Sequence, residues 1–170
     1  MVIGGQAVLL HGQPRLTRDI DITLGIDATE LGRVRSLADS LGLTPSVPDL
    51  EAFVRKTNVI PLTDSSTGLR IDMIFSFTVY ESEAIRRAVT VTFDEGSVQF
   101  AAVEDLIIHK LVAGRPRDIE DVAGVLARPP SLDEDYLGRW FAAFQEVVNR
   151  DLVGEFRTLR RNQDASGQVQ

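Results

Sequence analysis

The segment DIDITLGI, residues 19–26, alternates polar and apolar residues, and this two-residue period predicts a β-strand. Side chains along a strand point to opposite faces in turn, so Asp19 and Asp21 are expected on one face and the isoleucines between them on the core side. A later strand is predicted around Asp72, which also stands between apolar neighbours. Aspartate is depleted within strands, so three of them in such positions suggest more than an outward polar face.

The rest of the pattern predicts an α/β (α+β) fold, a mixed β-sheet with helices packed on it and a helical C-terminal part. Further strands are expected at the N-terminus, at 51–62, at 69–75 and in a hairpin at 89–101. Helices are expected at 28–42, 81–89, 102–114, 117–127 and from a capping box of Ser131 and Glu134 onward.

No repeat or internal linker divides the chain of 170 residues, so one domain is expected. Its core would span 1–128, and a C-terminal helical extension of the same domain would span 129–161. The polar residues 162–170 are expected to form a disordered tail.

Composition excludes several classes of protein. The chain has no cysteine, which excludes disulfides, cysteine zinc sites and a thiol nucleophile. No apolar run approaches the roughly 20 residues that span a bilayer, and the N-terminus lacks a signal-peptide layout, so a cytoplasmic protein is expected. The net charge of −7 argues against a broad basic face for nucleic acid, although a local one remains open.

Three carboxylates converging from Asp19, Asp21 and Asp72 would suit a hard cation such as Mg²⁺ or Mn²⁺, which also grips phosphates. The alternative is a half-exposed sheet whose polar residues face water. Upstream, Gly4 and Gly5 follow a short strand and precede a short helix. Glycine there lets backbone amides approach a phosphate, and the alternative is a plain tight turn.

A Gly-Gly turn, a spacer and then RLTRDIDI resemble the first motif of the DNA-polymerase-β-like nucleotidyltransferase superfamily, and more narrowly of the AbiEii group of type IV toxin–antitoxin toxins. The third carboxylate, Asp72, matches that pattern. A later motif of the group resembles KLVAGRPRDIED, which contains Lys110, Arg115, Arg117, Asp118 and Asp121. The resemblance covers roughly residues 3 to 126, and it implies a nucleotidyltransferase fold.

Lys110 is one of only two lysines among 18 basic residues. It lies on or beside the apolar face of its helix, where it could snorkel its charge outward or project an ammonium toward a triphosphate. Asp118 and Asp121 could cap the next helix, as an N-cap and its N3 partner, or position basic side chains. Arg115 and Arg117 could clamp phosphate or be solvated loop charges.

The resemblance implies transfer of a nucleoside monophosphate from an NTP to an acceptor hydroxyl. Asp19, Asp21 and Asp72 would hold Mg²⁺ or Mn²⁺, with Lys110 as a further catalytic residue. The nucleotide would be bound by Gly4, Gly5, Arg15, Thr17, Arg115 and Arg117, and Asp118 and Asp121 would support them. The implied acceptor is RNA, such as tRNA, and the implied partner is a cognate antitoxin. Two alternatives stay open: a small-molecule (antibiotic) nucleotidyltransferase, and a non-catalytic nucleotidyltransferase-like binding domain.

Overall fold

The computed structural model describes residues 1–12, 14, 16–128 and 131–167 of the chain. These residues divide into two compact units. The first unit is Met1–Gln6 with Leu16–Ala101, and the second is Ala7–Arg15 with Ala102–Gln170, apart from the residues outside the description. The division at Ala101 lies within the range 1–128 that the sequence predicts as a single core, and each unit has its own buried side chains.

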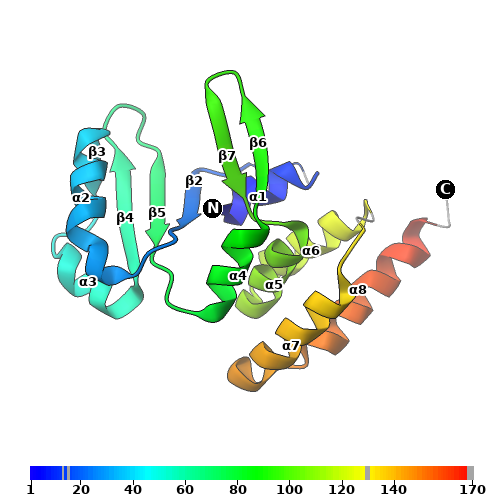
Figure 1. Cartoon of the computed structure of the whole chain (residues 1–170). Coiled ribbons are helices and arrows are strands. Elements are labelled where there is room, and N and C mark those ends of the chain that lie inside the picture. Colours follow the sequence, from blue (N-terminus) through cyan, green and yellow to red (C-terminus); the bar gives the residue numbers. More distant parts are fainter. Residues whose placement is uncertain (13, 15, 129–130, 168–170) are drawn as a thin grey trace. The chain divides into compact units, whose positions relative to one another are not determined.

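The strands of the first unit form one mixed, seven-stranded sheet within the described residues, so the predicted fold class is confirmed (Figure 1). Their order across the sheet is β3-β4-β5-β2-β1-β7-β6. The strands are β1 (Val2–Ile3), β2 (Asp19–Thr23), β3 (Leu43–Pro45), β4 (Val59–Asp64), β5 (Arg70–Ile74), β6 (Val89–Phe93) and β7 (Gly96–Phe100).

The helices of the first unit follow or interrupt these strands. They are η1 (Ala28–Glu30), α2 (Leu31–Ser40), α3 (Leu50–Thr57) and α4 (Val79–Arg87). The helix α1 (Gly4–Leu10) begins directly after β1, and the chain passes from the first unit to the second within it, after Gln6. The α3 helix corrects a prediction, because the sequence analysis assigned this segment to a strand that begins at 51. The carboxylate of Asp49 accepts a hydrogen bond from the Ala52 N–H at 2.9 Å and so caps a helix whose buried residues are Leu50 and Val54. The strand that was predicted begins only at Val59.

The helices α2 and α3 cover one face of the sheet. The core there joins Val34 and Val54 of the helices to Ile60, Leu62 and Met73 of the strands. Since Met73 points into this core, its neighbour Asp72 points to the opposite face. The buried face is therefore the one that stabilises the sheet, and the aspartates stand on the other.

The second unit is helical. Its helices are α5 (Val103–Ala113), α6 (Pro116–Leu126), α7 (Glu134–Val148) and α8 (Leu152–Gly167). Figure 1 shows α7 and α8 running side by side in opposite directions, and the rings of Phe141 and Phe156 pack between them with centroids 5.4 Å apart. Asn149, in the left-handed conformation with φ 51°, ends α7 and allows the chain to reverse.

Two further details of this unit differ from prediction. The N-cap of α7 is Asp133, whose carboxylate accepts from the Tyr136 N–H at 2.9 Å, and not Ser131. The helix α8 continues to Gly167, whereas a disordered tail was predicted from 162 onward; residues 168–170 of that tail lie outside the description. Within the described ranges, no helix is long and apolar enough to cross a membrane.

Candidate functional site

The three aspartates of the first motif stand on one face of the sheet. Strands β2 and β5 are parallel, and their register pairs Asp21 with Asp72 and Asp19 with Arg70. Paired residues of neighbouring strands point to the same side, and so do residues two apart on one strand. Asp19, Asp21 and Asp72 therefore share a face. The spacing predicted this for Asp19 and Asp21, and the pairing of β2 with β5 adds Asp72.

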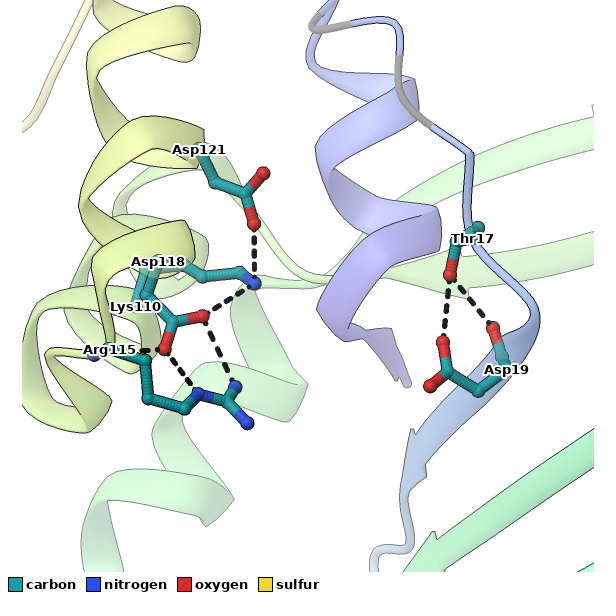
Figure 2. Close-up of polar contacts among 6 residues, drawn as sticks. All are labelled: Thr17, Asp19, Lys110, Arg115, Asp118 and Asp121. Atoms are coloured by element: carbon teal, nitrogen blue, oxygen red, sulfur yellow. Dashed lines mark hydrogen bonds and ion pairs between the residues drawn. The ribbon is translucent and has the colours of Figure 1, made fainter.

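Both carboxylate oxygens of Asp19 already have partners. The Thr17 hydroxyl donates to Oδ1 at 2.8 Å (Figure 2), and the Arg70 guanidinium lies 3.9 Å from Oδ2. The ion pair with Arg70 is largely exposed, and such pairs contribute little to stability. Thr17 therefore orients Asp19, while Arg70 is a partner that a cation could replace. This role of Arg70 was missed, because only the register of β2 against β5 reveals it.

The pKa of Asp72 is raised above its ordinary value. Burial is the largest cause, the positive charge of Arg70 opposes the rise, and the negative charge of Asp19 adds to it. The influence of Asp19 on Asp72 means that the charges of these carboxylates interact, as expected for groups on one face.

Gly4 allows the Asp21 carboxylate to lie against the start of α1. Its φ is +61°, and a Cβ built on it would lie 1.9 Å from Oδ2 of Asp21. Any other residue at this position would be strained and would displace that carboxylate. The Gly-Gly turn thus does more than reverse the chain, since it provides room for one of the three aspartates.

Three carboxylates on the same face of adjacent strands are ligands of the type that a hard cation prefers. In the described parts of the chain, however, no three histidine or carboxylate side chains are gathered closely enough to form a finished metal site. Asp19 is engaged by Thr17 and Arg70 in this structure. Metal binding by these residues stays a prediction.

The second motif forms a buried ion cluster in the second unit (Figure 2). The Lys110 ammonium lies 2.9 Å from Oδ1 of Asp118 and 2.7 Å from Oδ2 of Asp121, and its side chain is only 8% exposed. Lys110 therefore does not snorkel to solvent. It joins α5 to α6 through two buried carboxylates, so of the two alternatives for Asp118 and Asp121 the structure shows the one in which they position a basic side chain.

Asp118 occupies the third position of α6, so it is the N3 residue and not the predicted N-cap. The N-cap is Arg115, whose guanidinium Nε donates to Oδ2 of Asp118 at 2.6 Å and whose backbone N–H donates to the same oxygen at 3.3 Å. Burial would raise the pKa of Asp118, but the hydrogen bonds and charges of Arg115 and Lys110 outweigh it and lower that pKa. Asp118 is thus held as a carboxylate.

The remaining predicted residues are divided between the two units. Gly5 is the second residue of α1, and Arg117 is exposed on α6. Arg15 lies outside the described residues. The carboxylates belong to the first unit and the Lys110 cluster to the second. That Lys110 serves the same reaction as the carboxylates stays a prediction.

The sequence resembles nucleotidyltransferases in its Gly-Gly turn and its three aspartates, and the structure brings these features together on a mixed sheet. The profile of the family described as "Nucleotidyl transferase AbiEii toxin, Type IV TA system" matches residues 2–170. The chain therefore belongs to the AbiEii family of nucleotidyltransferases, which confirms the resemblance.

Among solved structures, the chain is similar to the crystal structure of an antigenic nucleotidyltransferase-like protein from Paracoccidioides brasiliensis. The TM-score is 0.49 and the sequence identity 15%, over 92% of this chain and 83% of that chain. A search of curated proteins finds no significant match.

Proposed function

We propose that this chain is a metal-dependent nucleotidyltransferase that moves a nucleoside monophosphate from an NTP to an acceptor hydroxyl. The observation that carries the proposal is the register of β2 against β5, which puts Asp19, Asp21 and Asp72 on one face beside Gly4. Membership of the AbiEii family supports the same chemistry.

In the proposed reaction, the acceptor oxygen bonds to the α-phosphorus of the NTP and the bond from that phosphorus to the β-phosphate oxygen breaks. Pyrophosphate leaves, and the proton of the attacking hydroxyl passes to Asp72. A carboxylate whose pKa is raised is better suited to accept that proton, since a general base works best with a pKa near the operating pH.

Asp19, Asp21 and Asp72 would hold Mg²⁺ or Mn²⁺, and such an ion would neutralise the triphosphate charge when bound. Thr17 would keep Asp19 oriented when an ion takes the place of Arg70. The N–H groups of Gly4 and Gly5 would face the triphosphate, and Arg15, Arg115, Arg117 and Lys110 would balance its negative charge. Asp118 and Asp121 position Lys110 for this purpose.

The proposed acceptor is RNA, with a tRNA as the first substrate to test, and the proposed role is that of a toxin restrained by a cognate antitoxin. The family description supports the toxin–antitoxin role. The acidic net charge favours a different acceptor, a small cationic molecule such as an antibiotic, as the second candidate.

Pyrophosphate release distinguishes these acceptors. The protein is incubated with Mg²⁺ and each NTP in turn, together with total tRNA, an aminoglycoside or a mixture of unfolded proteins. The proposal predicts release that requires tRNA and one preferred NTP. If pyrophosphate release requires the aminoglycoside instead, the acceptor is a small molecule and not RNA. If the protein binds nucleotide but releases no pyrophosphate in any mixture, the proposal that it is an enzyme is contradicted.

A further inference from the structure

A cavity of about 1120 Å³ lies along α8 in the second unit. It is lined by Ile119 of α6 and by residues between Arg150 and Arg161, and we call it the α8 groove. Its lining includes four of the arginines of the chain: Arg150, Arg157, Arg160 and Arg161. In a chain with a net charge of −7, this is a local concentration of positive charge.

The acidic residues of the α8 groove already have structural partners. Oδ1 of Asp151 accepts the Gly154 N–H at 2.8 Å, at the first turn of α8. Glu155 is paired with Arg150, whose Nε donates to Oε1 at 3.1 Å, and Arg150 also donates to the Leu111 carbonyl at 2.9 Å. These three residues therefore stabilise the ends of the helices, and the Glu155 carboxylate is already paired with Arg150.

Arg157 and Arg161 lie one helical turn apart and face the same side of α8. Both are exposed, and neither is ion-paired with any carboxylate side chain that the structure describes; Arg161 makes a 3.4 Å contact with the Thr158 hydroxyl. Arg160, between them, is paired with Glu134. Two like charges four residues apart weaken a helix slightly, so the fold alone does not explain this pair.

We propose that the α8 groove binds the phosphate backbone of the RNA acceptor through Arg157 and Arg161. The proposal rests on the proposed function for the identity of the ligand. Guanidinium groups form paired hydrogen bonds with phosphate, and these two are about 6 Å apart along the helix axis, which suits a run of phosphates.

An acidic protein segment is a less suitable occupant. Stable protein interfaces need a buried apolar or aromatic anchor. None of the large exposed hydrophobic side chains of the described residues lies between positions 150 and 161. The apolar side chains of the lining, Ile119 and Leu159, are half-buried, so the exposed part of the groove at Arg157 and Arg161 offers charge to a phosphate backbone.

The test compares two variants of the full chain with the same change of net charge. Arg157→Gln/Arg161→Gln neutralises the groove, and Arg33→Gln/Arg35→Gln neutralises two exposed arginines of α2. Binding of fluorescently labelled tRNA and of labelled poly-glutamate is measured by anisotropy over a range of salt. The groove variant should lose about tenfold in tRNA affinity, with the slope of log affinity against log salt shallower by about one unit, while the α2 variant keeps both.

Melting temperature and transfer of labelled nucleotide to tRNA separate this proposal from the proposed function. The groove variant should melt no lower than the wild type, because it removes a like-charge pair. If tRNA binding depends on the groove but the wild type does not label tRNA, the groove binds RNA as proposed, and the proposal that RNA is the acceptor is contradicted. Three results would overturn the proposal that the α8 groove binds RNA, whatever the labelling shows. They are equal tRNA binding by both variants, no tRNA binding by the wild type, and groove-dependent binding of poly-glutamate alone.

Discussion

The surroundings of Asp72 oppose its negative charge. Burial and the charge of Asp19 raise its pKa, so its ionised form lowers stability at neutral pH. Asp72→Asn should therefore raise the melting temperature in metal-free buffer at neutral pH. The same change should lower nucleotidyl transfer by about 10²-fold or more, because the proposed general base is lost.

Asp39→Asn is the control for this change, since Asp39 is exposed on α2 and belongs to no part of the site. It should leave both the melting temperature and the transfer rate close to those of the wild type. A fall in the melting temperature of Asp72→Asn would show that the carboxylate stabilises the fold, which contradicts this account of its environment.

Gly4 provides the second prediction at the level of single residues. Gly4→Ala should cost about 1 kcal/mol or more in the free energy of unfolding, because a left-handed φ is unfavourable for alanine. It should also reduce activity, since the new methyl group would displace the Asp21 carboxylate. Chemical denaturation and transfer assays measure the two effects.

Gly32→Ala is the matched control for Gly4→Ala. Gly32 lies within α2, has no atom within 4 Å of a built Cβ, and does not have a positive φ. Alanine there should raise stability by about 0.5–1 kcal/mol, the usual gain within a helix. Similar effects at the two glycines would contradict the special role of position 4.

At the scale of elements, Lys110 connects α5 to α6 through Asp118 and Asp121. Removing one member of a buried ion pair typically costs about 3–5 kcal/mol, because it leaves an unpaired buried charge. Lys110→Met should therefore destabilise the protein strongly. The triple variant Lys110→Met/Asp118→Asn/Asp121→Asn should recover much of that loss when unfolding is measured in urea.

If the triple variant is no more stable than Lys110→Met, the buried cluster is not the source of the loss. A loss of stability in Lys110→Met does not exclude a role in catalysis. Nucleotide affinity is therefore measured for each folded variant well below its melting temperature.

The pH dependence of stability gives a second prediction for this pair of helices. The pKa of Asp118 is lowered from the ordinary value of 3.8, so its carboxylate stabilises the native state above that pH. The stabilisation is lost as the pH falls through the lowered pKa. Asp118→Asn should thus be less stable than the wild type at neutral pH, and the difference should shrink below pH 3.8. A difference that is independent of pH would contradict the charged role of Asp118.

The elements also show how far sequence reasoning reaches. Strands β2 and β5, and the shared face of Asp19 and Asp21, followed from a two-residue period, since that period is local. That Asp72 lies on the same face depends on the pairing of β5 with β2, which is not local. The apolar residues of the α3 segment suggest a strand, whereas the N-cap Asp49 just before them starts a helix. The burial of Lys110 could not be predicted from its own helix, because it depends on two carboxylates that α6 brings to α5.

At the scale of the whole molecule, the charge is distributed unevenly. The chain carries a net charge of −7, while Arg157 and Arg161 on α8 have no acidic partner in the described part of the chain. The sequence does not reveal this pair, because its significance depends on which carboxylates of α8 are already paired. If RNA is the acceptor, transfer should therefore weaken as salt rises to physiological strength.

The central claim is that the shared-face aspartates catalyse transfer of a nucleoside monophosphate. The most direct test incubates the wild type and Asp72→Asn with each α-³²P-labelled NTP, Mg²⁺ and total RNA, and measures the label in RNA. The account predicts that the wild type labels RNA with one preferred NTP and that Asp72→Asn, though folded, does not. Equal labelling by the two proteins, or NTP binding by the wild type with no label in any acceptor, would contradict it.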